Sequence, residues 1–474
     1  MTPIVNIILP VYNRREVTER FIECLIAQSY IYYRLLLIDD GSSDGTYEMV
    51  KSKVNNLAVI KGKGDWWWAG SLQQGIKWLE KNEADDNEIV MFANDDVTFD
   101  ESFLQKAIEI LNGENNIFLL PQVYDEKTDM IIESGVEADL SRMTFKPATS
   151  KKKINCLPTR CLFMRITDLK KVGGFRPRIL PHYWSDYEFT IRAFRKGIQL
   201  RTSQDIVIIP CNETTGFRKF NNTNFLKFIK NYFSKRSVGN PIYSSVFILL
   251  TNSLLYKPLN IVKIWFHALL YILRQLRAYI SQRLQKIKTL KAIDKYESKL
   301  KIILGSSGNL QDGWISTDYP ILDLTDEETF HAMFKPDSVS NFLAEHVWEH
   351  LTLDEAAIAC QICFKFLKKD STLRIAVPDG FHSDIAYISQ VKPGGYGPGA
   401  DSHMVLYNYK TLSTVLINAG FEVKLLEWHD ENGSFHSENW DIENGMIQRS
   451  SGYDLRNKHN PTAYTSLIID AIKL

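Results

Sequence analysis

The sequence lacks the features that mark secreted and nucleic-acid-binding proteins. Its 474 residues include only six cysteines, scattered along the chain, which fits reduced thiols better than a disulfide framework. The first residues carry no basic segment followed by a long apolar run, so we expect no signal peptide and a cytoplasmic protein. The 56 basic and 56 acidic residues cancel, and no overall positive charge points to nucleic acid as a partner.

Long hydrophobic runs are missing too. No stretch reaches the ~18 uncharged apolar residues that a membrane-spanning helix needs. The most apolar segments, 242–255 and 261–276, are separated by Pro258 and precede a segment rich in lysine and arginine that ends at Lys301. A basic, aromatic helix of this kind suits a membrane interface, and it equally suits an interdomain hairpin with a solvated basic face. Peripheral membrane contact through 242–301 is therefore one of two open alternatives.

Two parts of the chain show short, β-branched strands that alternate with helices, a pattern typical of a parallel sheet covered by helices. The chain is also too long for a single hydrophobic core. We therefore predict an α/β protein of three parts: residues 1–235, a helical basic linker at 236–299, and residues 300–474. The expected strands of the first part are 5–11, 35–38, 58–60 and 89–93, and a helix is expected over 71–80. The expected strands of the last part are 302–304, 314–317, 339–344, 373–377 and 421–426.

Acidic residues follow two of the strands predicted in the first part. Asp39 and Asp40 come after the second strand, and Asn94, Asp95 and Asp96 come after the fourth. In open α/β sheets, ligands collect beyond the carboxyl ends of the strands, and carboxylates there suit Mg²⁺ or Mn²⁺ beside a diphosphate. Taken alone, the first pair also fits a tight turn and the second a helix cap.

The combination is more specific than either cluster. Pro10-Val11-Tyr12-Asn13, the run from Asp39 to Thr46 and Asn94-Asp95-Asp96 resemble the inverting GT-A glycosyltransferases of family two, over roughly residues 4–240. The resemblance implies a Rossmann-like domain that binds a nucleotide-diphosphate sugar. Asn94 replaces the first aspartate of the family's D-x-D pattern, so Asp96 is the better metal candidate. The residues implied in donor binding are Pro10, Tyr12, Asp39, Asp40, Trp67 and Asp95, and those implied in binding Mn²⁺ or Mg²⁺ are Asp96 and Asn94.

Two further segments resemble bacterial rhamnosyltransferase-like members of that family. Gly64 to Ser71 contains three consecutive tryptophans, of which Trp67 is expected to stack on the donor, while core packing is the alternative for at least one of the three. The segment from His182 to Phe189 resembles an acceptor-side element in which Asp186 matches the catalytic base. One base suffices for inversion, because the acceptor oxygen attacks the anomeric carbon directly. For Arg192, an ion pair is the favoured role.

The last part resembles class I SAM-dependent methyltransferases, over about residues 300–474. The resemblance rests on Leu304 to Gly308, on Asp318, on the Glu345 to Leu351 segment and on the strand that begins at Leu373. It implies that S-adenosylmethionine is bound and that His346 is the base for methyl transfer to a hydroxyl, with a structural role for His346 as the alternative. Ser307 replaces a frequent glycine, and its Cβ could crowd the cofactor. The residues implied in cofactor binding are Gly305, Ser306, Gly308 and Asp318.

A glycine-rich segment, 394–403, is expected as a loop. It is either a lid over an acceptor, with Asp401 and His403 at its active-site end, or a plain surface loop. We predict a cytoplasmic bifunctional enzyme of bacterial surface polysaccharide synthesis, which glycosylates a glycan or lipid-linked acceptor and O-methylates the glycan. Under the membrane-contact alternative it lies at the inner face of the cell membrane. The alternative is a glycosyltransferase whose methyltransferase-like domain is a degenerate scaffold. A glycan-binding protein without turnover is disfavoured, because binding alone needs no base.

Overall fold

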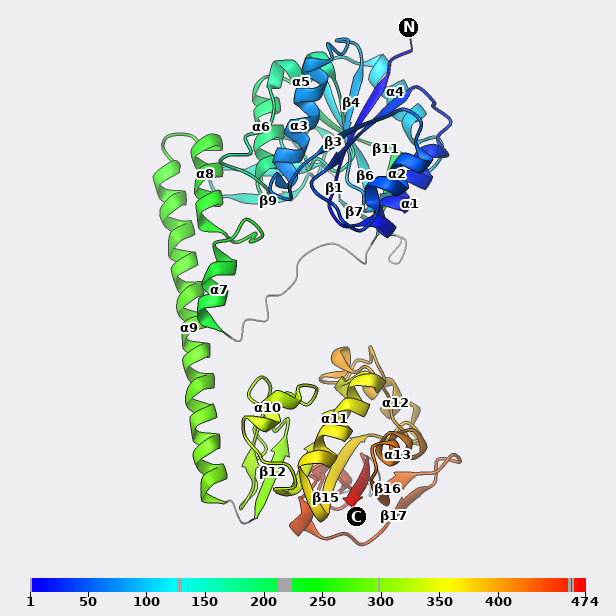
Figure 1. Ribbon diagram of the computed structural model, residues 1–474, viewed down its shortest axis with the longest axis vertical. Helices are drawn as coiled ribbons and strands as arrows, with labels where there is room; N and C mark the ends of the chain where they lie inside the picture. Colours follow the sequence, from blue (N-terminus) through cyan, green and yellow to red (C-terminus); the bar gives the residue numbers. More distant parts are fainter. Residues whose placement is uncertain are drawn as a thin grey trace. The chain divides into compact units, whose positions relative to one another are not determined.

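The computed structural model describes residues 2–125, 130–133, 135–211, 224–296, 299–458, 462 and 464–474. The chain forms two compact units, Met1–Leu276 and Arg277–Leu474, each containing its own α/β sheet (Figure 1). The boundary lies inside one long helix, α9 (Lys257–Lys295). The segment predicted as a separate linker is thus divided, its apolar part in the first unit and most of its basic part in the second.

The first unit is built on a nine-stranded sheet with the order β3-β2-β1-β4-β10-β6-β11-β5, and with β7 paired to β6. The four strands expected from the sequence are present and parallel: β1 (Val5–Val11), β2 (Tyr33–Asp39), β3 (Leu57–Lys61) and β4 (Ile89–Phe92). The remaining strands are β5 (Val97–Thr98), β6 (Ile117–Asp125), β7 (Met130–Glu133), β10 (Leu162–Arg165) and β11 (Gln199–Pro210), and a separate pair is β8 (Val136–Asp139) and β9 (Thr144–Pro147).

Helices cover both faces of this sheet. Successive residues of β1 point to opposite faces, so Ile7 packs into one core and Ile8 into the other. On the first face lie α1 (Arg15–Ile26), α2 (Thr46–Lys53) and α4 (Phe103–Gly113), and on the second lie α3 (Trp67–Lys81), α5 (Ile166–Val172) and α6 (Ser185–Arg195) (Figure 1). The chain leaves β1 toward β2 and β3 and then crosses to β4 on the other side. Ligands of such sheets bind where the strand order reverses, here beyond β1 and β4.

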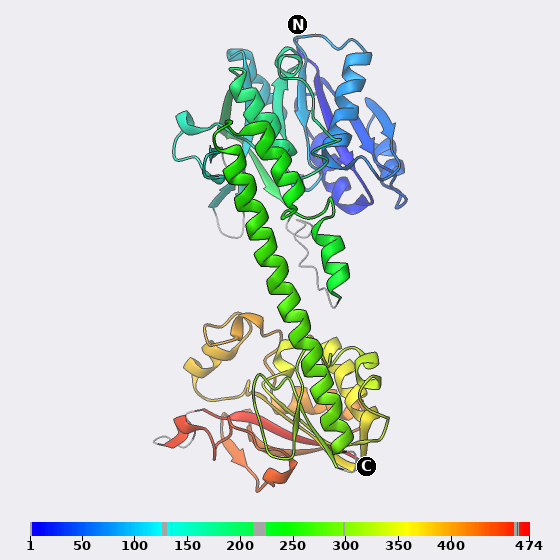
Figure 2. The same ribbon diagram turned by 90° about the vertical axis from the view of Figure 1, so that its left-hand side faces the viewer.

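Three helices complete the first unit: α7 (Phe225–Tyr232), α8 (Pro241–Thr251) and the first part of α9. The two views show α8 alongside α9 (Figures 1 and 2), and Trp265 Nε1 of α9 donates to Ser245 Oγ of α8 at 3.0 Å. Pro258 occupies the first turn of α9, where its missing N–H costs no intrahelical bond. Within the described ranges, no helix combines the length and hydropathy needed to span a bilayer.

The second unit contains a seven-stranded sheet with the order β13-β12-β14-β15-β18-β16-β17. The strands β13 (Ile315–Ser316), β12 (Leu300–Leu304), β14 (Val339–Glu345) and β15 (Leu367–Pro378) are parallel, and β18 (Ser466–Lys473) runs antiparallel between β15 and β16 (Glu422–His429). The other elements are β17 (Phe435–Ser437), α10 (Glu327–His331), α11 (Leu353–Phe366), α12 (Ile385–Val391) and α13 (Tyr409–Asn418). Here the strand order reverses between β12 and β14.

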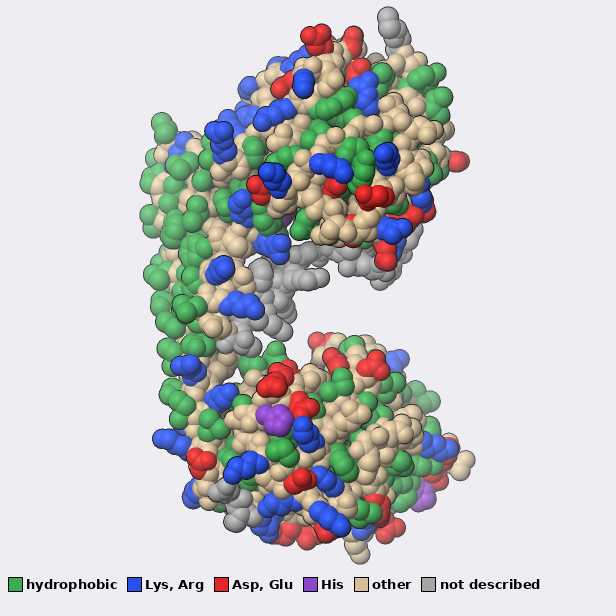
Figure 3. Space-filling view, in the orientation of Figure 1, with side chains coloured by type: hydrophobic (Ala, Val, Ile, Leu, Met, Phe, Trp, Pro, Cys, Tyr) green, Lys and Arg blue, Asp and Glu red, His purple; other side chains and the backbone are tan. Residues whose placement is uncertain are grey.

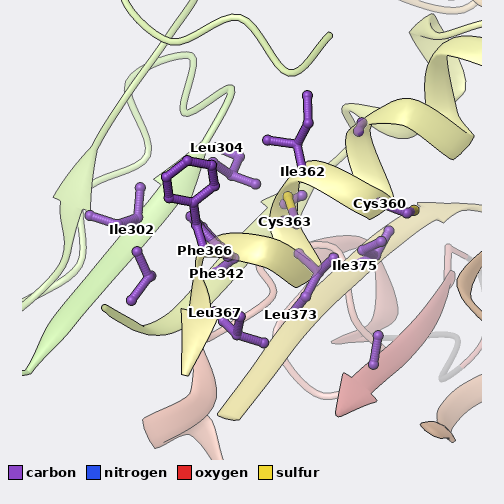
Figure 4. Packing of buried hydrophobic residues seen from close by; sticks show 14 of the residues in the cluster. Ile302, Leu304, Phe342, Cys360, Ile362, Cys363, Phe366, Leu367, Leu373 and Ile375 are labelled. Carbon is purple, nitrogen blue, oxygen red and sulfur yellow. The ribbon is translucent and has the colours of Figure 1, made fainter. Parts of the chain in front are cut away.

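The core of the second unit lies between this sheet and α11 (Figure 4). Ile302 and Phe342 of the strands meet Cys363 and Phe366 of the helix, all buried. Arg374 of β15 is also fully buried, and Asp470 opposite it on β18 accepts hydrogen bonds from its Nε and Nη2, each at 2.7 Å. Its Nη1 donates to the carbonyl oxygens of Asp441 and Gly445, also at 2.7 Å, and a buried charge is tolerated when it is paired in this way.

Candidate functional site

A pocket of about 650 Å³ opens at the predicted edge of the first sheet, where the strand order reverses. Three strand ends contribute to its wall: residues after β1, after β2 and after β4. Of the residues predicted to bind donor or metal, all except Asp39 line it. They are Pro10, Tyr12, Asp40, Trp67, Asn94, Asp95 and Asp96.

The first acidic pair organises backbone turns. Asp39 Oδ1 accepts from the Ser42 amide at 2.8 Å, as the tight-turn alternative expects. Asp40 accepts from the Gly64 amide through Oδ1 and from the Trp66 amide through Oδ2, both at 2.9 Å. Asp40 therefore lines the pocket and also holds the loop that leads to the tryptophans.

The second acidic pair has two different environments. Asp95 accepts from Thr18 Oγ1 at 2.9 Å and pairs with Arg14 Nη1 at 2.8 Å, and burial raises its pKa to about 6. Asp96 lies 3.5 Å from Arg14 Nη2 through Oδ2, while its buried Oδ1 accepts no hydrogen bond from the described residues. A buried carboxylate oxygen without a donor is costly unless a cation binds it. Asp96 therefore fits a divalent ion, and Asp95 is occupied by structural contacts.

The three tryptophans divide between core and pocket. Trp66 packs into the core beneath α3, and Trp68 Nε1 donates to Thr159 Oγ1 at 3.3 Å at the pocket margin. Trp67 takes a left-handed φ of 58° and places its ring 5.9 Å from that of His182. Helix α3 begins at Trp67, four residues before the start expected at Ser71. Core packing thus accounts for Trp66, and Trp67 faces the pocket.

Three arginines of the pocket did not emerge from the sequence, namely Arg14, Arg160 and Arg236, whereas His182 belongs to the predicted acceptor-side segment. The three arginines bring positive charge to a site whose ligand would be a diphosphate. Burial and, secondly, the charge of Arg236 lower the pKa of His182 to about 4, so its imidazole is neutral at pH 7. Arg14 directly follows the Pro10-Val11-Tyr12-Asn13 segment, which was a usable signal. Arg236 lies within the predicted linker, so no local pattern assigned it to the site.

Asp186 lies on the first turn of α6, beside the pocket but not among its lining residues. Its Oδ1 accepts from Ser185 Oγ at 3.1 Å. The preceding residues His182 and Tyr183 do line the pocket, and Trp184 joins the two segments with a left-handed φ of 69°. On the same helix, Arg192 Nε donates to buried Glu188 at 2.9 Å, the ion-pair role expected for it.

The second unit has a pocket of about 460 Å³ where its strand order reverses. Gly305, Ser306 and Gly308 line it, as predicted, but Asp318 does not. Asp318 accepts from Ser306 Oγ at 2.6 Å and from the Ser307 amide at 2.8 Å, so it holds the glycine-rich turn from behind. Ser307 has a φ of 43°, in the left-handed region that favours glycine. Serine at this position, where glycine is frequent in the resembled family, therefore strains the backbone.

His346 also lines this pocket, next to the glycine-rich turn. Both of its ring nitrogens have neighbours: Nδ1 lies 2.9 Å from Glu349 Oε1 and Nε2 lies 3.1 Å from Ser466 Oγ. The 394–403 segment forms part of the wall through Gly397 to Ala400 and His403. Asp401, predicted beside His403, is exposed and is not a lining residue.

Comparison with known proteins assigns the first domain. The family described as Glycosyl transferase family 2 matches residues 6–172, which include both acidic clusters and the tryptophan segment. Glycosyltransferase AglE of Haloferax volcanii is 24% identical over 218 residues, which are 43% of this chain and 66% of AglE. The N-terminal region is a family 2 glycosyltransferase region of the GT-A type. The chain spans slightly less than two thirds of AglE.

Some solved structures are similar to part of the chain, at low TM-scores and low sequence identity. TarS 1–349 of S. aureus in complex with UDP-GlcNAc has a TM-score of 0.38 and 17% identity, covering 53% of this chain and 68% of that one. GalNAc-T7 with UDP, GalNAc and Mn²⁺ has a TM-score of 0.39 and 13% identity, covering 52% and 50%. The C-terminal unit is an α/β domain to which these comparisons assign no family.

Proposed function

We propose that the N-terminal domain transfers a sugar, with inversion, from a nucleotide-diphosphate donor to a glycan or lipid-linked acceptor of a bacterial surface polysaccharide. The observation that carries this proposal is the buried Asp96, which lines a pocket shared with Asp40 and Trp67 and whose Oδ1 has no donor among the described residues. That arrangement lies inside the region matched by the family. The pocket brings together a carboxylate oxygen for an ion, a polar strand end and an aromatic face. These are the features that a site for a nucleotide sugar requires.

The proposed chemistry uses one base and a neutralised leaving group. The acceptor oxygen forms a bond to the anomeric carbon while the bond from that carbon to the diphosphate oxygen breaks, and Asp186 takes the hydroxyl proton. Asp96 and Asn94 would hold a divalent ion, which neutralises the developing charge on the diphosphate when bound. Arg14, Arg160 and Arg236 add fixed positive charge along the same pocket.

The proposal is tested by release of nucleoside diphosphate. The full-length protein is incubated with Mn²⁺, a panel of UDP-, GDP- and dTDP-sugars and a lipid-linked glycan extract, and the released nucleotide is quantified. Acceptor-stimulated release from one nucleotide class is the expected result. Binding of nucleotides without any release, with every acceptor preparation, would favour a glycan-binding protein.

We propose methyl transfer as the activity of the second domain. It is favoured by a pocket at the reversal of strand order, with a turn from Gly305 to Gly308 opening into it. Gly305, Ser306 and Gly308 would hold S-adenosylmethionine, and Asp318 would keep their turn in place. The cofactor supplies an electrophilic methyl group when bound, and His346, whose ring lines the same pocket, would take the proton of the acceptor hydroxyl. The competing proposal is a degenerate scaffold domain, which would bind no cofactor.

We also propose that the α8–α9 surface of the first unit touches a membrane. Hydrophobic side chains gather over these helices (Figure 3), and Leu259, Val262 and Phe266 are 63%, 67% and 55% exposed. Trp265 and Tyr271 accompany them, and Lys263 and Arg274 lie on the same helix. Apolar and aromatic side chains with basic neighbours suit an anionic bilayer surface, where a lipid-linked acceptor would be found.

A further inference from the structure

Three side chains of the second unit converge at its pocket without any role in the proposed transfers. Glu349, His350 and His403 each offer one ligand atom, and these atoms lie within 4.8 Å of one another. All three residues line the pocket. We propose that they form a divalent transition-metal site, separate from the aspartates of the N-terminal domain and independent of whether the second domain transfers methyl groups.

The two histidines are oriented as metal ligands usually are. His403 Nδ1 lies 2.6 Å from the carbonyl oxygen of Val391. His350 Nδ1 lies 3.0 Å from Ser402 Oγ, which donates its own proton to the Gly399 carbonyl at 2.8 Å, and 3.3 Å from the Ser402 carbonyl oxygen. A carbonyl oxygen only accepts, so Nδ1 carries the proton in both rings and each Nε2 keeps its lone pair. Metal-binding histidines typically donate their second N–H to a carbonyl or a carboxylate in this way. The tautomers therefore suit coordination through Nε2.

The environment of Glu349 indicates independently that a cation binds here. Glu349 is 1% exposed, and neither carboxylate oxygen accepts a hydrogen bond from the described residues. Oε1 lies 2.9 Å from His346 Nδ1, a close contact that lacks hydrogen-bond geometry. Leaving a buried carboxylate so poorly satisfied is costly. A bound divalent ion would satisfy it directly.

The types of ligand atom at this site indicate which metal ions it would bind. Two imidazoles and one carboxylate favour Zn²⁺ and related transition ions over Mg²⁺ or Ca²⁺. Bonds of about 2.0–2.2 Å to one tetrahedral ion would place the ligand atoms roughly 3.3–3.6 Å apart. Rotation of His350, which is exposed, closes the remaining distance without moving the buried residues. Three protein ligands leave a coordination position open to the pocket, which an oxygen donor such as a hydroxyl or carboxylate would fill.

His346 is a positioning residue in this arrangement. Its Nδ1 contacts Glu349 Oε1 and its Nε2 contacts Ser466 Oγ, which in turn donates to the Arg449 carbonyl oxygen at 2.8 Å. This chain of contacts connects the glutamate to Ser466 and to the Arg449 backbone. Loss of such a second partner typically weakens metal binding about 10- to 100-fold.

The test is calorimetric titration of the full-length protein with Zn²⁺, with bound metal counted by elemental analysis after gel filtration. All proteins carry Asp96→Asn, so that the N-terminal aspartate site does not contribute. His350→Ala is the main variant because its exposed side chain can be removed without disturbing the core. His436→Ala, an exposed histidine paired with Asp430, is the matched control.

We expect one Zn²⁺ per chain in the Asp96→Asn parent and in the His436→Ala control. Affinity should fall at least a hundredfold in His350→Ala and in His403→Ala, and about tenfold in His346→Gln. Zn²⁺ should also raise the Tm of the parent and not that of His350→Ala, a readout that does not depend on catalysis. No bound Zn²⁺ in the parent, or equal affinity in the parent and both histidine variants, would overturn the site. Neither result bears on S-adenosylmethionine binding.

Discussion

At the scale of single residues, adjacent residues with the same side chain make different contacts. Asp95 and Asp96 are adjacent, yet one is tied to Arg14 and Thr18 and the other keeps an oxygen without a donor among the described residues. The sequence predicted both as site residues, and it ranked Asp96 first from the family pattern. Arg14 is the residue that distinguishes them, since it pairs with Asp95 at the shorter distance. This contact depends on β1 lying beside β4, which no local pattern contains.

The proposed base gives the first prediction. Asp186→Asn should lower the rate of sugar transfer by about 10²- to 10⁴-fold, because a positioned base contributes that much. Donor affinity should change little, since Asp186 lies outside the pocket lining. Single-turnover kinetics and donor titration measure the two effects separately. Asp205→Asn, an exposed carboxylate on β11, is the control. Near-normal turnover in Asp186→Asn would remove the base assignment.

His182 predicts a dependence of stability on pH. Its pKa is lowered to about 4 by burial, whereas an unfolded histidine titrates near 6.5. The unfolded chain therefore binds a proton first, and stability is lost as pH falls from 6.5 toward 4. Between pH 6.5 and 5 the wild type should lose about 2 kcal/mol from this group.

The His182→Gln variant should lack the part of the pH-dependent stability loss that His182 causes. The His331→Gln variant, changed at an exposed histidine, should lose as much stability as the wild type. Urea unfolding of the first unit, followed by tryptophan fluorescence at the two pH values, measures the difference. Identical pH dependence in His182→Gln and wild type would contradict a buried, neutral imidazole.

At the scale of elements, β1 to β4 and the parallel strands of the second sheet were predictable, whereas the other strands of the first sheet and the helix boundaries near the sites were not. Buried, β-branched runs identified β1, β2, β4, β12 and β14, because parallel strands covered on both faces are apolar throughout. Helix α3 was expected from Ser71, yet it begins at Trp67 because Asp40 holds the amides just before it. That bond joins two segments distant in sequence. The reversed strand β18 was also not expected, since it pairs with β15, which is distant in sequence.

The α8–α9 surface gives a prediction at this scale. The wild type should float with vesicles containing anionic lipid, and Val262→Glu/Phe266→Glu should bind at least tenfold more weakly, because it replaces exposed apolar contacts with repelled charges. Ile385→Glu, at an 82% exposed position of the second unit, is the matched control. Sedimentation run in parallel separates the outcomes. If the wild type does not bind vesicles but self-associates through this surface, the surface binds a second copy of the chain and not a membrane.

At the scale of the whole molecule, one chain joins a family 2 glycosyltransferase region to a second α/β domain with its own pocket. If both act on one glycan, covalent linkage raises the effective concentration of the acceptor at the second site. The division of the molecule within α9 was not foreseen, because the change from apolar to basic residues along the helix resembles an independent linker. The sequence indicated the glycine-rich turn and His346, but not the cluster of Glu349, His350 and His403, because His403 is distant in sequence from the other two.

Cofactor binding by the second unit is predicted at this scale. Titration with S-adenosylmethionine should show one saturable site, weakened at least tenfold by Asp318→Ala because the turn at Ser306 and Ser307 loses its hydrogen-bond acceptor. Asp326→Ala, at the cap of α10, is a control of similar type outside the pocket. If the folded wild type binds no S-adenosylmethionine, the second unit is a scaffold domain attached to a glycosyltransferase.

The central claim is that the N-terminal pocket binds a nucleotide diphosphate with the help of a divalent ion at Asp96. It is tested most directly by calorimetric titration of wild type and Asp96→Asn with UDP, GDP and dTDP, each with and without Mn²⁺, using Asp100→Asn as the control. We expect one nucleotide to bind, with an affinity that Mn²⁺ raises at least tenfold in wild type and in Asp100→Asn but not in Asp96→Asn. Binding of none of the three nucleotides, or equal Mn²⁺ enhancement in Asp96→Asn, would contradict the claim.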